Sequence, residues 1–207
     1  MGTDPITEFF YSKTPFQLAA NEICIRAEER ASQIFFLEDG VVKQTFIAQS
    51  GQELCLNLYK SGSFFPLMDG LADIPNQYTF AALTDSTGYK APVNEVKAWL
   101  QTNPEVSYEL SVRLLKGLHG MLLKTASLME GNARALIVQT LLTLSQRFPT
   151  SDNAINLVLT HQKLANLTGL SRETVTRELT ALKQLQLVSV DAHEIMLLDR
   201  KALFDYV

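Results

Sequence analysis

The stretch that most constrains the fold runs from Leu159 to Val188 and reads LTHQKLANLTGLSRETVTRELTALKQLQLV. Thr160 precedes a short apolar-patterned segment, and its hydroxyl can cap a helix by accepting a hydrogen bond from a free first-turn amide. The sequence therefore predicts a helix from His161 to Leu167. Gly169 then ends that helix, because glycine adopts a left-handed turn at little conformational cost.

A second helix is predicted directly after this turn. Ser171 is a suitable cap for a helix from Arg172 to about Leu185. Apolar residues recur along it at spacings of four, three and three, which places them on one inward face. That face comprises Val175, Leu179, Leu182 and Leu185. Two short helices joined by a glycine turn indicate a helix-turn-helix. An ordinary helical hairpin with a solvated charged face stays open as the alternative.

The polar residues at the start of the second helix suit recognition of DNA. An α-helix fits the major groove, and its N-terminal residues reach the base edges. Arg172 and Arg177 can each pair with O6 and N7 of guanine, and Glu173 can accept from the amino group of cytosine. Short polar groups nearby suit the phosphate contacts that fix register. The predicted DNA-binding residues are Thr160, His161, Gln162, Ser171, Arg172, Glu173, Thr174 and Arg177.

The same stretch resembles the DNA-binding signature of the Crp/Fnr family of bacterial transcription regulators. Ser171 to Val175 followed by Arg177 matches that family's recognition helix residue for residue. The resemblance implies that the two arginines and Glu173 read DNA. It extends more loosely over the whole chain, in length and in order of elements. The partners it implies are double-stranded DNA with an inverted-repeat site, a second copy of the chain, RNA polymerase and a small-molecule effector.

The rest of the composition indicates an ordinary cytoplasmic protein of one or two domains in 207 residues. No run of about 18 apolar residues is present, so no membrane span is expected. The first 15 residues lack the pattern of a secretory signal. Cys24 and Cys55 stand far apart and predict neither a disulfide framework nor a metal knuckle. We expect no metal and no cofactor.

The net charge of −4 does not by itself indicate a nucleic-acid binder. Residues 1–100 carry 7 basic and 12 acidic side chains, a net of −5. Residues 150–207 carry 6 basic and 7 acidic side chains, a net of −1. Any contact with DNA must therefore come from individually placed groups rather than from a generally basic surface.

Residues 1–100 are predicted to form a β-rich sensor domain. Short apolar or alternating runs are separated by turns that contain glycine. The predicted strands are Gln33 to Leu37, Val41 to Ile47 as its partner, Glu53 to Tyr59, Tyr78 to Leu83, and Gly88 to Ala91. In the third run, Leu54, Leu56 and Leu58 alternate with other residues and predict one buried face. Strands of this length suggest a sandwich or barrel. The resemblance implies the jelly roll that the Crp/Fnr family shares with cupins.

A helical region follows. Pro92 to Leu100 is expected to be a short helix with Pro92 in its first turn. Pro104 to about Glu130 is expected to be a long helix. One apolar stripe on it holds Leu110, Leu114, Gly117, Met121 and Leu128, and a second holds Leu115, Leu118, Leu122 and Met129. One stripe can pack on the β domain and the other on a second copy of the helix. The alternative is that both stripes are buried within one chain.

The predicted division of the chain is residues 1–100 for the sensor domain, 101–131 for the dimerisation helix and hinge, and 132–207 for a winged helix-turn-helix domain. Gly131 ends the long helix and Asn132 caps the next, residues 133–148. A β-hairpin of residues 188–190 and 194–198 forms the wing, with His193 near its tip. Asp199 caps a last short helix. The fold class is therefore α+β.

The sensor domain lacks the groups that several known ligands need. No arginine lies between Arg30 and Arg113, although a buried phosphate favours a two-pronged cation. The cyclic-nucleotide members of the family carry such an arginine, so cyclic AMP is not expected to bind in their usual mode. An iron–sulfur cluster needs four thiolates, and the chain has two cysteines. All three histidines, His119, His161 and His193, lie outside residues 1–100.

Two interpretations remain at this point. Phe64 to Met68 and Tyr78 to Phe80 could line an apolar effector pocket that faces the long helix, or they could be plain core. The chain as a whole is expected to be a homodimeric transcription regulator with an unidentified effector. The alternative is a cupin-like small-molecule-binding or catalytic protein with a C-terminal interaction domain. No nucleophile and base stand out together, so we predict that it is not an enzyme.

Overall fold

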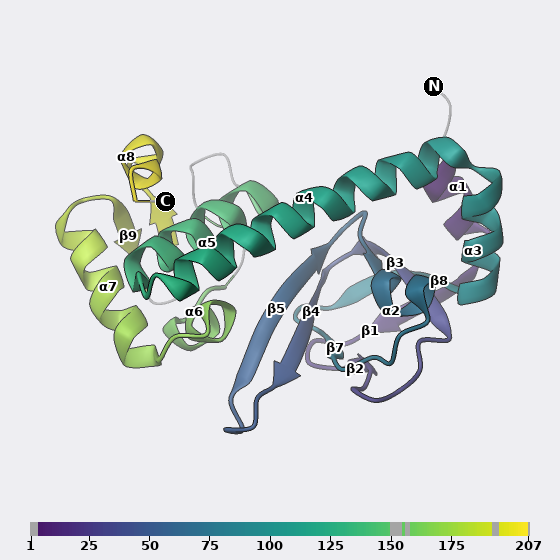
Figure 1. Cartoon of the computed structure of the whole chain (residues 1–207), viewed down its shortest axis with the longest axis horizontal. Helices are drawn as coiled ribbons and strands as arrows, with labels where there is room; N and C mark the ends of the chain where they lie inside the picture. Colours follow the sequence, from purple (N-terminus) through teal and green to yellow (C-terminus); the bar gives the residue numbers. More distant parts are fainter. Residues whose placement is uncertain (1–3, 150–154, 156–157, 192–194, 207) are drawn as a thin grey trace. The chain divides into compact units, whose positions relative to one another are not determined.

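The structure is a computed structural model that describes residues 4–149, 155, 158–191 and 195–206. The chain divides into two compact units, Met1–Lys116 and Gly117–Val207. The first unit contains eight strands and the second is mainly helical (Figure 1). The predicted α+β class is confirmed.

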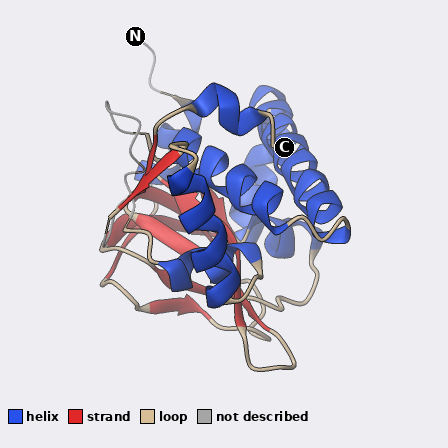
Figure 2. Ribbon diagram, turned by 90° about the vertical axis from the view of Figure 1, so that its left-hand side faces the viewer, coloured by secondary structure: helices blue, strands red, loops and turns tan. Residues whose placement is uncertain are grey.

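The first unit is built on two four-stranded sheets, with strand orders β1-β8-β3-β6 and β2-β7-β4-β5. All strand pairs in them are antiparallel (Figure 2, strands in red). The strands are β1 (Thr14–Leu18), β2 (Ile23–Ile25), β3 (Gln33–Asp39), β4 (Val41–Ile47), β5 (Glu53–Lys60), β6 (Phe64–Phe65), β7 (Thr79–Ala82) and β8 (Ser86–Pro92). The helices are α1 (Pro5–Tyr11), α2 (Leu67–Ala72), α3 (Val93–Thr102) and α4 (Pro104–Met129), which continues into the second unit. Two antiparallel sheets of four strands each confirm the predicted jelly roll.

Strand β3 is buried on both faces, which explains its uninterrupted apolar sequence. Phe35 and Leu37 belong to the core cluster between the two sheets. Ile34 and Phe36 belong to a second cluster, to which the helices of this unit also contribute. Alternate residues of a strand point to opposite faces, so a strand covered on both sides is apolar throughout.

The predicted pairing of Val41–Ile47 with the preceding strand is wrong. Strand β3 pairs with β6 and β8, whereas β4 pairs with β5 and β7. Gly40 lies between them with φ of 97°, and a side chain there would overlap Ser86. Since both edges of each strand are occupied by strands from elsewhere in the chain, the turn at Gly40 leads into the opposite sheet instead of forming a hairpin.

The predicted buried face of alternating leucines on β5 is also wrong. Cys55 and Leu58 are buried, whereas Leu56 is 43% exposed. Gln44 of β4 pairs with Asn57, but the next residue pairs with Cys55, so Leu56 is the extra residue of a bulge. A bulge shifts the alternation by one residue. For this reason the buried positions change from odd to even numbers along the strand, from Cys55 to Leu58.

Other elements of the first unit were missed or misplaced. The sequence did not predict α1, β1, β2, β6 and α2, which are short. Pro92 is not in the first turn of α3, because it still pairs with Gln33 as the last residue of β8. The helix therefore begins one residue later, at Val93.

Helix α4 begins at the predicted position and ends at Met129, close to the predicted Glu130. Its buried residues are Val106 and Leu110, both in the core of the first unit. Of the residues in the two predicted stripes, all of which the structure describes, Leu110 alone is buried, so the predicted burial of both stripes within one chain is wrong. From Leu114 onward both stripes are exposed, as Leu114, Leu115, Leu118, Met121, Leu122, Leu128 and Met129 show. No described helix is long and apolar enough to cross a membrane.

The second unit contains the end of α4 and the elements that follow it. These are α5 (Ala133–Arg147), α6 (His161–Thr168), α7 (Arg172–Gln184), β9 (Val188–Val190), β10 (Ile195–Leu197) and α8 (Arg200–Phe204). Gly131 ends α4 with φ of 67°, and the side chain of Asn132 caps α5 by accepting from the Ala135 amide. Strands β9 and β10 are antiparallel, and Asp199 caps α8. The predicted end of the long helix at Gly131, the caps at Asn132 and Asp199 and the pairing of the two hairpin strands are confirmed, whereas a hinge at residue 131 stays a prediction.

Candidate nucleic-acid interface

Helix α6 is positioned by its cap and by the turn that ends it. The hydroxyl of Thr160 accepts from the Lys163 amide at 3.1 Å. Gly169 adopts the left-handed conformation, with φ of 76°. Both predicted features are confirmed. The ammonium of Lys163 donates to the carbonyl of Val158 at 3.0 Å, which holds this side chain against the chain segment before the helix.

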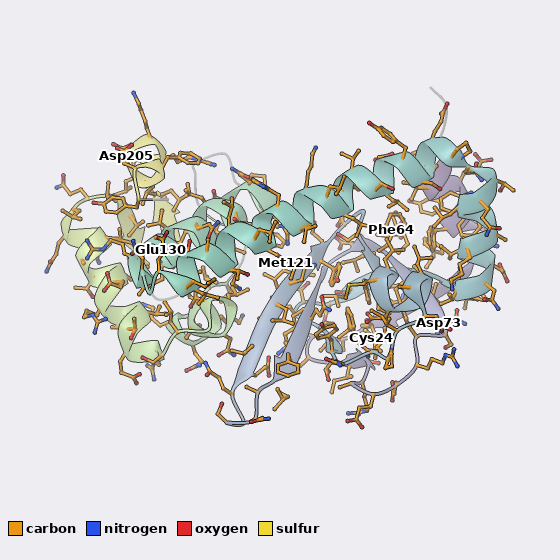
Figure 3. All side chains as sticks on the ribbon, viewed as in Figure 1. Cys24, Phe64, Asp73, Met121, Glu130 and Asp205 are labelled. Atoms are coloured by element: carbon orange, nitrogen blue, oxygen red, sulfur yellow. The ribbon has the colours of Figure 1, made fainter. Side chains whose placement is uncertain are left out.

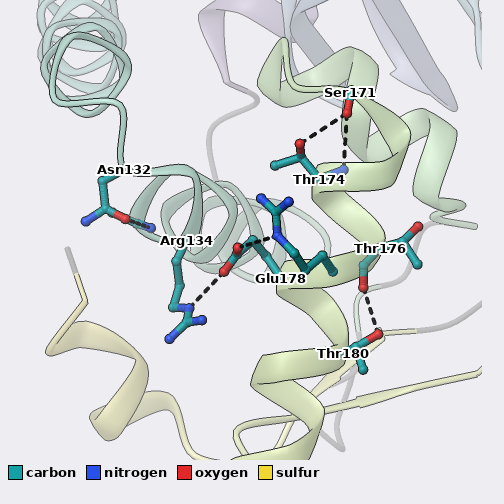
Figure 4. Close-up of polar contacts among 9 residues, drawn as sticks. Asn132, Arg134, Ser171, Thr174, Thr176, Glu178 and Thr180 are labelled. Atoms are coloured by element: carbon teal, nitrogen blue, oxygen red, sulfur yellow. Dashed lines mark hydrogen bonds and ion pairs between the residues drawn. The ribbon is translucent and has the colours of Figure 1, made fainter.

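Helix α7 begins with the predicted serine cap. The hydroxyl of Ser171 accepts from the Thr174 amide at 3.1 Å and donates to the Thr174 hydroxyl at 3.1 Å (Figure 4). Val175, Leu179 and Leu182 are buried, as predicted. These contacts anchor α7 by its apolar face and leave its first turns exposed.

The fourth predicted member of that apolar face is wrong. Leu185 is 51% exposed, because α7 ends at Gln184. Gln186 then takes φ of 56°, and the Leu187 amide donates to the carbonyl of Leu182 at 3.0 Å. Because the chain reverses here, Leu187 takes the buried place that was predicted for Leu185, and its side chain is 7% exposed.

A hydrogen bond links the first residue of α6 to the second turn of α7. Nδ1 of His161 lies 2.9 Å from the hydroxyl oxygen of Thr176. The Thr176 hydroxyl donates its single proton to the carbonyl of Arg172 at 2.9 Å. Because that proton is already used, Nδ1 of His161 acts as the donor. His161 therefore serves to hold α6 on α7.

Arg172, Glu173 and Arg177 lie together on the exposed face of α7. With Thr176 they line a shallow hollow of about 400 Å³. The backbone amide and Ser171 hydroxyl at the start of the helix lower the pKa of Glu173, and Arg172 lowers it further. The carboxylate is therefore charged at neutral pH and able to accept hydrogen bonds.

A second hollow of about 340 Å³ meets the first at Arg172. It is lined by Leu159, Thr160, His161, Gln162, Arg172 and Asp191. The structure thus places six of the eight predicted residues around two adjoining hollows. The other two, Ser171 and Thr174, form the cap between the helices.

The sequence missed three residues that line these hollows, the apolar Leu159 and the polar Thr176 and Asp191. Thr176 stands four residues after Arg172, so it lies on the same helix face and helical spacing alone could have found it. Asp191 follows strand β9 and reaches the hollow only through the tertiary fold. The predicted wing residue His193 lies outside the described residues.

The phenylalanines predicted to line a pocket lie in the interior of the first unit. Phe65 stacks on Phe80 with ring centroids 5.6 Å apart, and on Phe35 at 5.2 Å. Phe64 packs in the cluster that includes Leu110 of α4. For these phenylalanines the core interpretation is confirmed, whereas Met68 is 50% exposed.

Neither cysteine has the environment of a reactive thiolate. Cys24 donates to the carbonyl of Phe80 at 3.3 Å, and burial raises its pKa to about 12 (Figure 3). Cys55 is 6% exposed. Reactive cysteines have lowered pKa values and partial exposure, so both are better explained as small packed side chains.

Comparison with known proteins agrees with this geometry. The model of the Crp-like helix-turn-helix domain matches residues 137–206, and that of the cyclic nucleotide-binding domain matches residues 15–103. The global nitrogen regulator of Nostoc sp. is 31% identical over 174 residues, which cover 80% of this chain and 76% of that protein. The chain belongs to the Crp/Fnr family of transcription regulators. The predicted resemblance is confirmed, and the cupin-like alternative is not favoured.

Other Crp/Fnr proteins match along nearly the whole chain. The cAMP-activated global transcriptional regulator CRP of Escherichia coli is 24% identical, covering 94% of each chain. The structure of FixK2 from Bradyrhizobium japonicum has a TM-score of 0.77 at 20% identity and covers 93% of this chain and 96% of its own. The c-di-GMP-responsive regulator CLP of Xanthomonas campestris also has a TM-score of 0.77, at 22% identity, with 94% and 98% covered. These two structural likenesses support the fold.

Proposed function

We propose that the chain is a homodimeric transcription regulator that reads an inverted-repeat DNA site through α7 and responds to an effector other than cyclic AMP. The observation that carries the proposal is the exposed start of α7, where Arg172, Glu173 and Arg177 lie together on a helix anchored by its opposite face. A helix presented in this way fits the major groove.

Each residue of this face has a role that suits its chemistry. Arg172 and Arg177 each pair with a guanine, and the charged carboxylate of Glu173 accepts from the amino group of a cytosine. Five polar residues at the caps and the start of α6 contact phosphates and set the register. These are Thr160, His161, Gln162, Ser171 and Thr174.

Dimerisation through α4 is part of the proposal. The apolar side chains of the two stripes are exposed from Leu114 to Met129, and Met121 and Leu122 are 64% and 60% exposed (Figure 3). An apolar surface of this extent on a single helix typically marks a protein contact. A second copy of α4 satisfies it along the same repeat. Two recognition helices related by a two-fold axis then read half-sites about 34 Å apart.

Selection from random DNA tests the site assignment. We expect the parent protein to enrich an inverted repeat whose half-sites are one helical turn apart. Arg172→Ala should weaken binding to the enriched site by about 1–3 kcal/mol and relax the preference at one base pair. Arg200→Ala, on α8, is the matched control and should keep that preference. Enrichment of no palindrome, or unchanged binding by Arg172→Ala, would refute the assignment of α7.

An effector other than cyclic AMP is supported by the charges and packing of the first unit. No arginine lies between Arg30 and Arg113, and stacked phenylalanines fill the space between the sheets. We expect calorimetric titration with cyclic AMP to show no binding at micromolar concentration, and DNA affinity to be unchanged by the nucleotide. Micromolar binding would contradict this part of the proposal. RNA polymerase in the cytoplasm is the proposed partner of the DNA-bound dimer.

A further inference from the structure

A largely shielded carboxylate joins two arginines beside the exposed face of α7. Glu178 accepts from Nε of Arg134 at 3.0 Å and from Nε of Arg177 at 3.3 Å. Each arginine uses a different oxygen, Oε2 and Oε1 respectively. Figure 4 shows Arg134 of α5 and Glu178 of α7 directed toward one another. The side chain of Glu178 is 14% exposed, whereas that of Arg177 is 70% exposed.

The position of Arg134 is unusual for a cation. It lies in the first turn of α5, where the positive end of the helix dipole disfavours positive charge. Pairing with Glu178 offsets this cost. The same pairing supplies Glu178 with a counter-ion of its own, so that the shielded carboxylate does not depend on Arg177 alone. Arg177 is therefore guided by Glu178 without being neutralised by it.

The contact with Glu178 leaves the two terminal nitrogens of the Arg177 guanidinium available to bind a base. Nε is engaged, and among the described residues no other hydrogen bond reaches this guanidinium. The two terminal nitrogens remain, and they form a fork that matches O6 and N7 of guanine. A side chain held before binding loses less rotational freedom when it binds, which favours the base it faces.

We infer that Glu178 is a positioning residue that sets the base preference of Arg177, and that Arg134 anchors it. This inference rests on the proposed function and identifies how specificity is set at one base pair. The competing explanation is that the bridge only clamps α5 to α7. A clamp affects the stability of the unit, whereas a positioning residue affects the preference for one base.

The test compares base preference in matched variants of the full-length protein. Binding constants are measured for the selected inverted repeat and for sites substituted at each base pair in turn. Arg177→Ala identifies the base pair that Arg177 reads. Glu178→Gln keeps the shape of Glu178 and removes its charge, and Asp205→Asn removes one exposed negative charge elsewhere in the same unit.

We expect Glu178→Gln to reduce discrimination at the Arg177 base pair by about tenfold and to leave the other base pairs unchanged. Asp205→Asn should leave discrimination unchanged at every base pair. In the Arg177→Ala background, Glu178→Gln should have no further effect on discrimination, because the residue that it positions is gone. Thermal unfolding of each variant shows separately how much the bridge stabilises the protein.

Arg134→Gln tests the anchor. Without Arg134, Glu178 has only Arg177 as a counter-ion, so Arg177 is drawn away from DNA and affinity for the selected site should fall about tenfold. Adding Glu178→Gln to Arg134→Gln should restore part of that affinity, which loss of a simple clamp would not do.

The outcomes separate this inference from the proposed function. If the parent selects an inverted repeat and Arg177→Ala loses one base preference that Glu178→Gln retains, the positioning role is overturned and the proposed function stands. If Arg177→Ala loses no base preference, the positioning role is overturned as well. If the parent selects no site, the proposed function fails and the role of Glu178 fails with it.

Discussion

Single side chains in this protein owe their properties to short-range contacts. Glu173 is charged because the first turn of α7 surrounds it with donors, and its pKa is lowered accordingly. Cys24 shows the opposite effect, because burial penalises the thiolate and raises its pKa to about 12. In both cases the shift of the pKa follows from where the backbone places the side chain.

The thiol of Cys24 gives a prediction at this scale. The Cys55→Ala variant leaves Cys24 as the only cysteine. Since its folded pKa is about 12, against an ordinary value of 9.0, the thiolate fraction at pH 8 is reduced, and alkylation by iodoacetamide should be about 1000-fold slower than in urea. The folded state binds this proton more tightly, so the associated stability is present below pH 9 and is lost as the pH approaches 12. Equal alkylation rates in the folded and unfolded protein would contradict the raised pKa.

The elements of the helix-turn-helix are held at their ends. Thr160 caps α6, Ser171 caps α7, and Gly169 turns the chain between them. The His161–Thr176 hydrogen bond then joins the two helices across the turn. Because each cap acts on the first turn, it positions the residues proposed to contact DNA as well as stabilising the helix.

Removal of the Ser171 cap should therefore have two effects. Ser171→Ala should lower the free energy of unfolding of the second unit by about 1 kcal/mol, and the Thr174 amide should exchange its hydrogen faster. Ser171→Asn should keep most of the stability, because asparagine also accepts from a first-turn amide. Hydrogen exchange measured by NMR resolves the Thr174 amide. Unchanged exchange in Ser171→Ala would show that the cap contributes nothing in solution.

At the scale of the whole molecule, α4 carries an apolar surface that is exposed among the described residues. Within the described residues, only Val106 and Leu110 of this helix are buried. The three-part division of the chain, with boundaries at residues 100 and 131, stays a prediction. The structure itself divides into two units near residue 116, within α4. A helix shared in this way is well placed to carry a dimer contact along its length.

The proposed dimer can be tested on this helix. Leu118→Glu combined with Leu122→Glu should convert the protein to a monomer at micromolar concentration, because two charges would be buried in the contact. Lys116→Glu also changes charge on the exposed surface of α4 but lies outside both stripes, so it should remain dimeric. Sedimentation velocity measures the mass of each. A parent protein that is monomeric with and without DNA would rule out the dimer.

The sequence by itself determined the features that depend on near neighbours. Caps at Thr160, Ser171 and Asp199, the glycine turn at Gly169 and the extent of α4 follow from hydrogen bonds and periodicity within a few residues. The family motif from Ser171 to Arg177 could be read in the same way. These predictions succeeded because the competing conformations of such short segments are few.

Only the tertiary structure decided the features that depend on distant segments. Strands β3 and β4 are neighbours in sequence but belong to different sheets, since other strands occupy both edges of each. The bulge at Leu56 reversed the buried face of β5, and the turn at Gln186 replaced Leu185 with Leu187 in the core. The bridge from Arg134 to Glu178 joins residues 44 positions apart. Pairing and burial at such separations are set by competition among long-range contacts, which local patterns do not record.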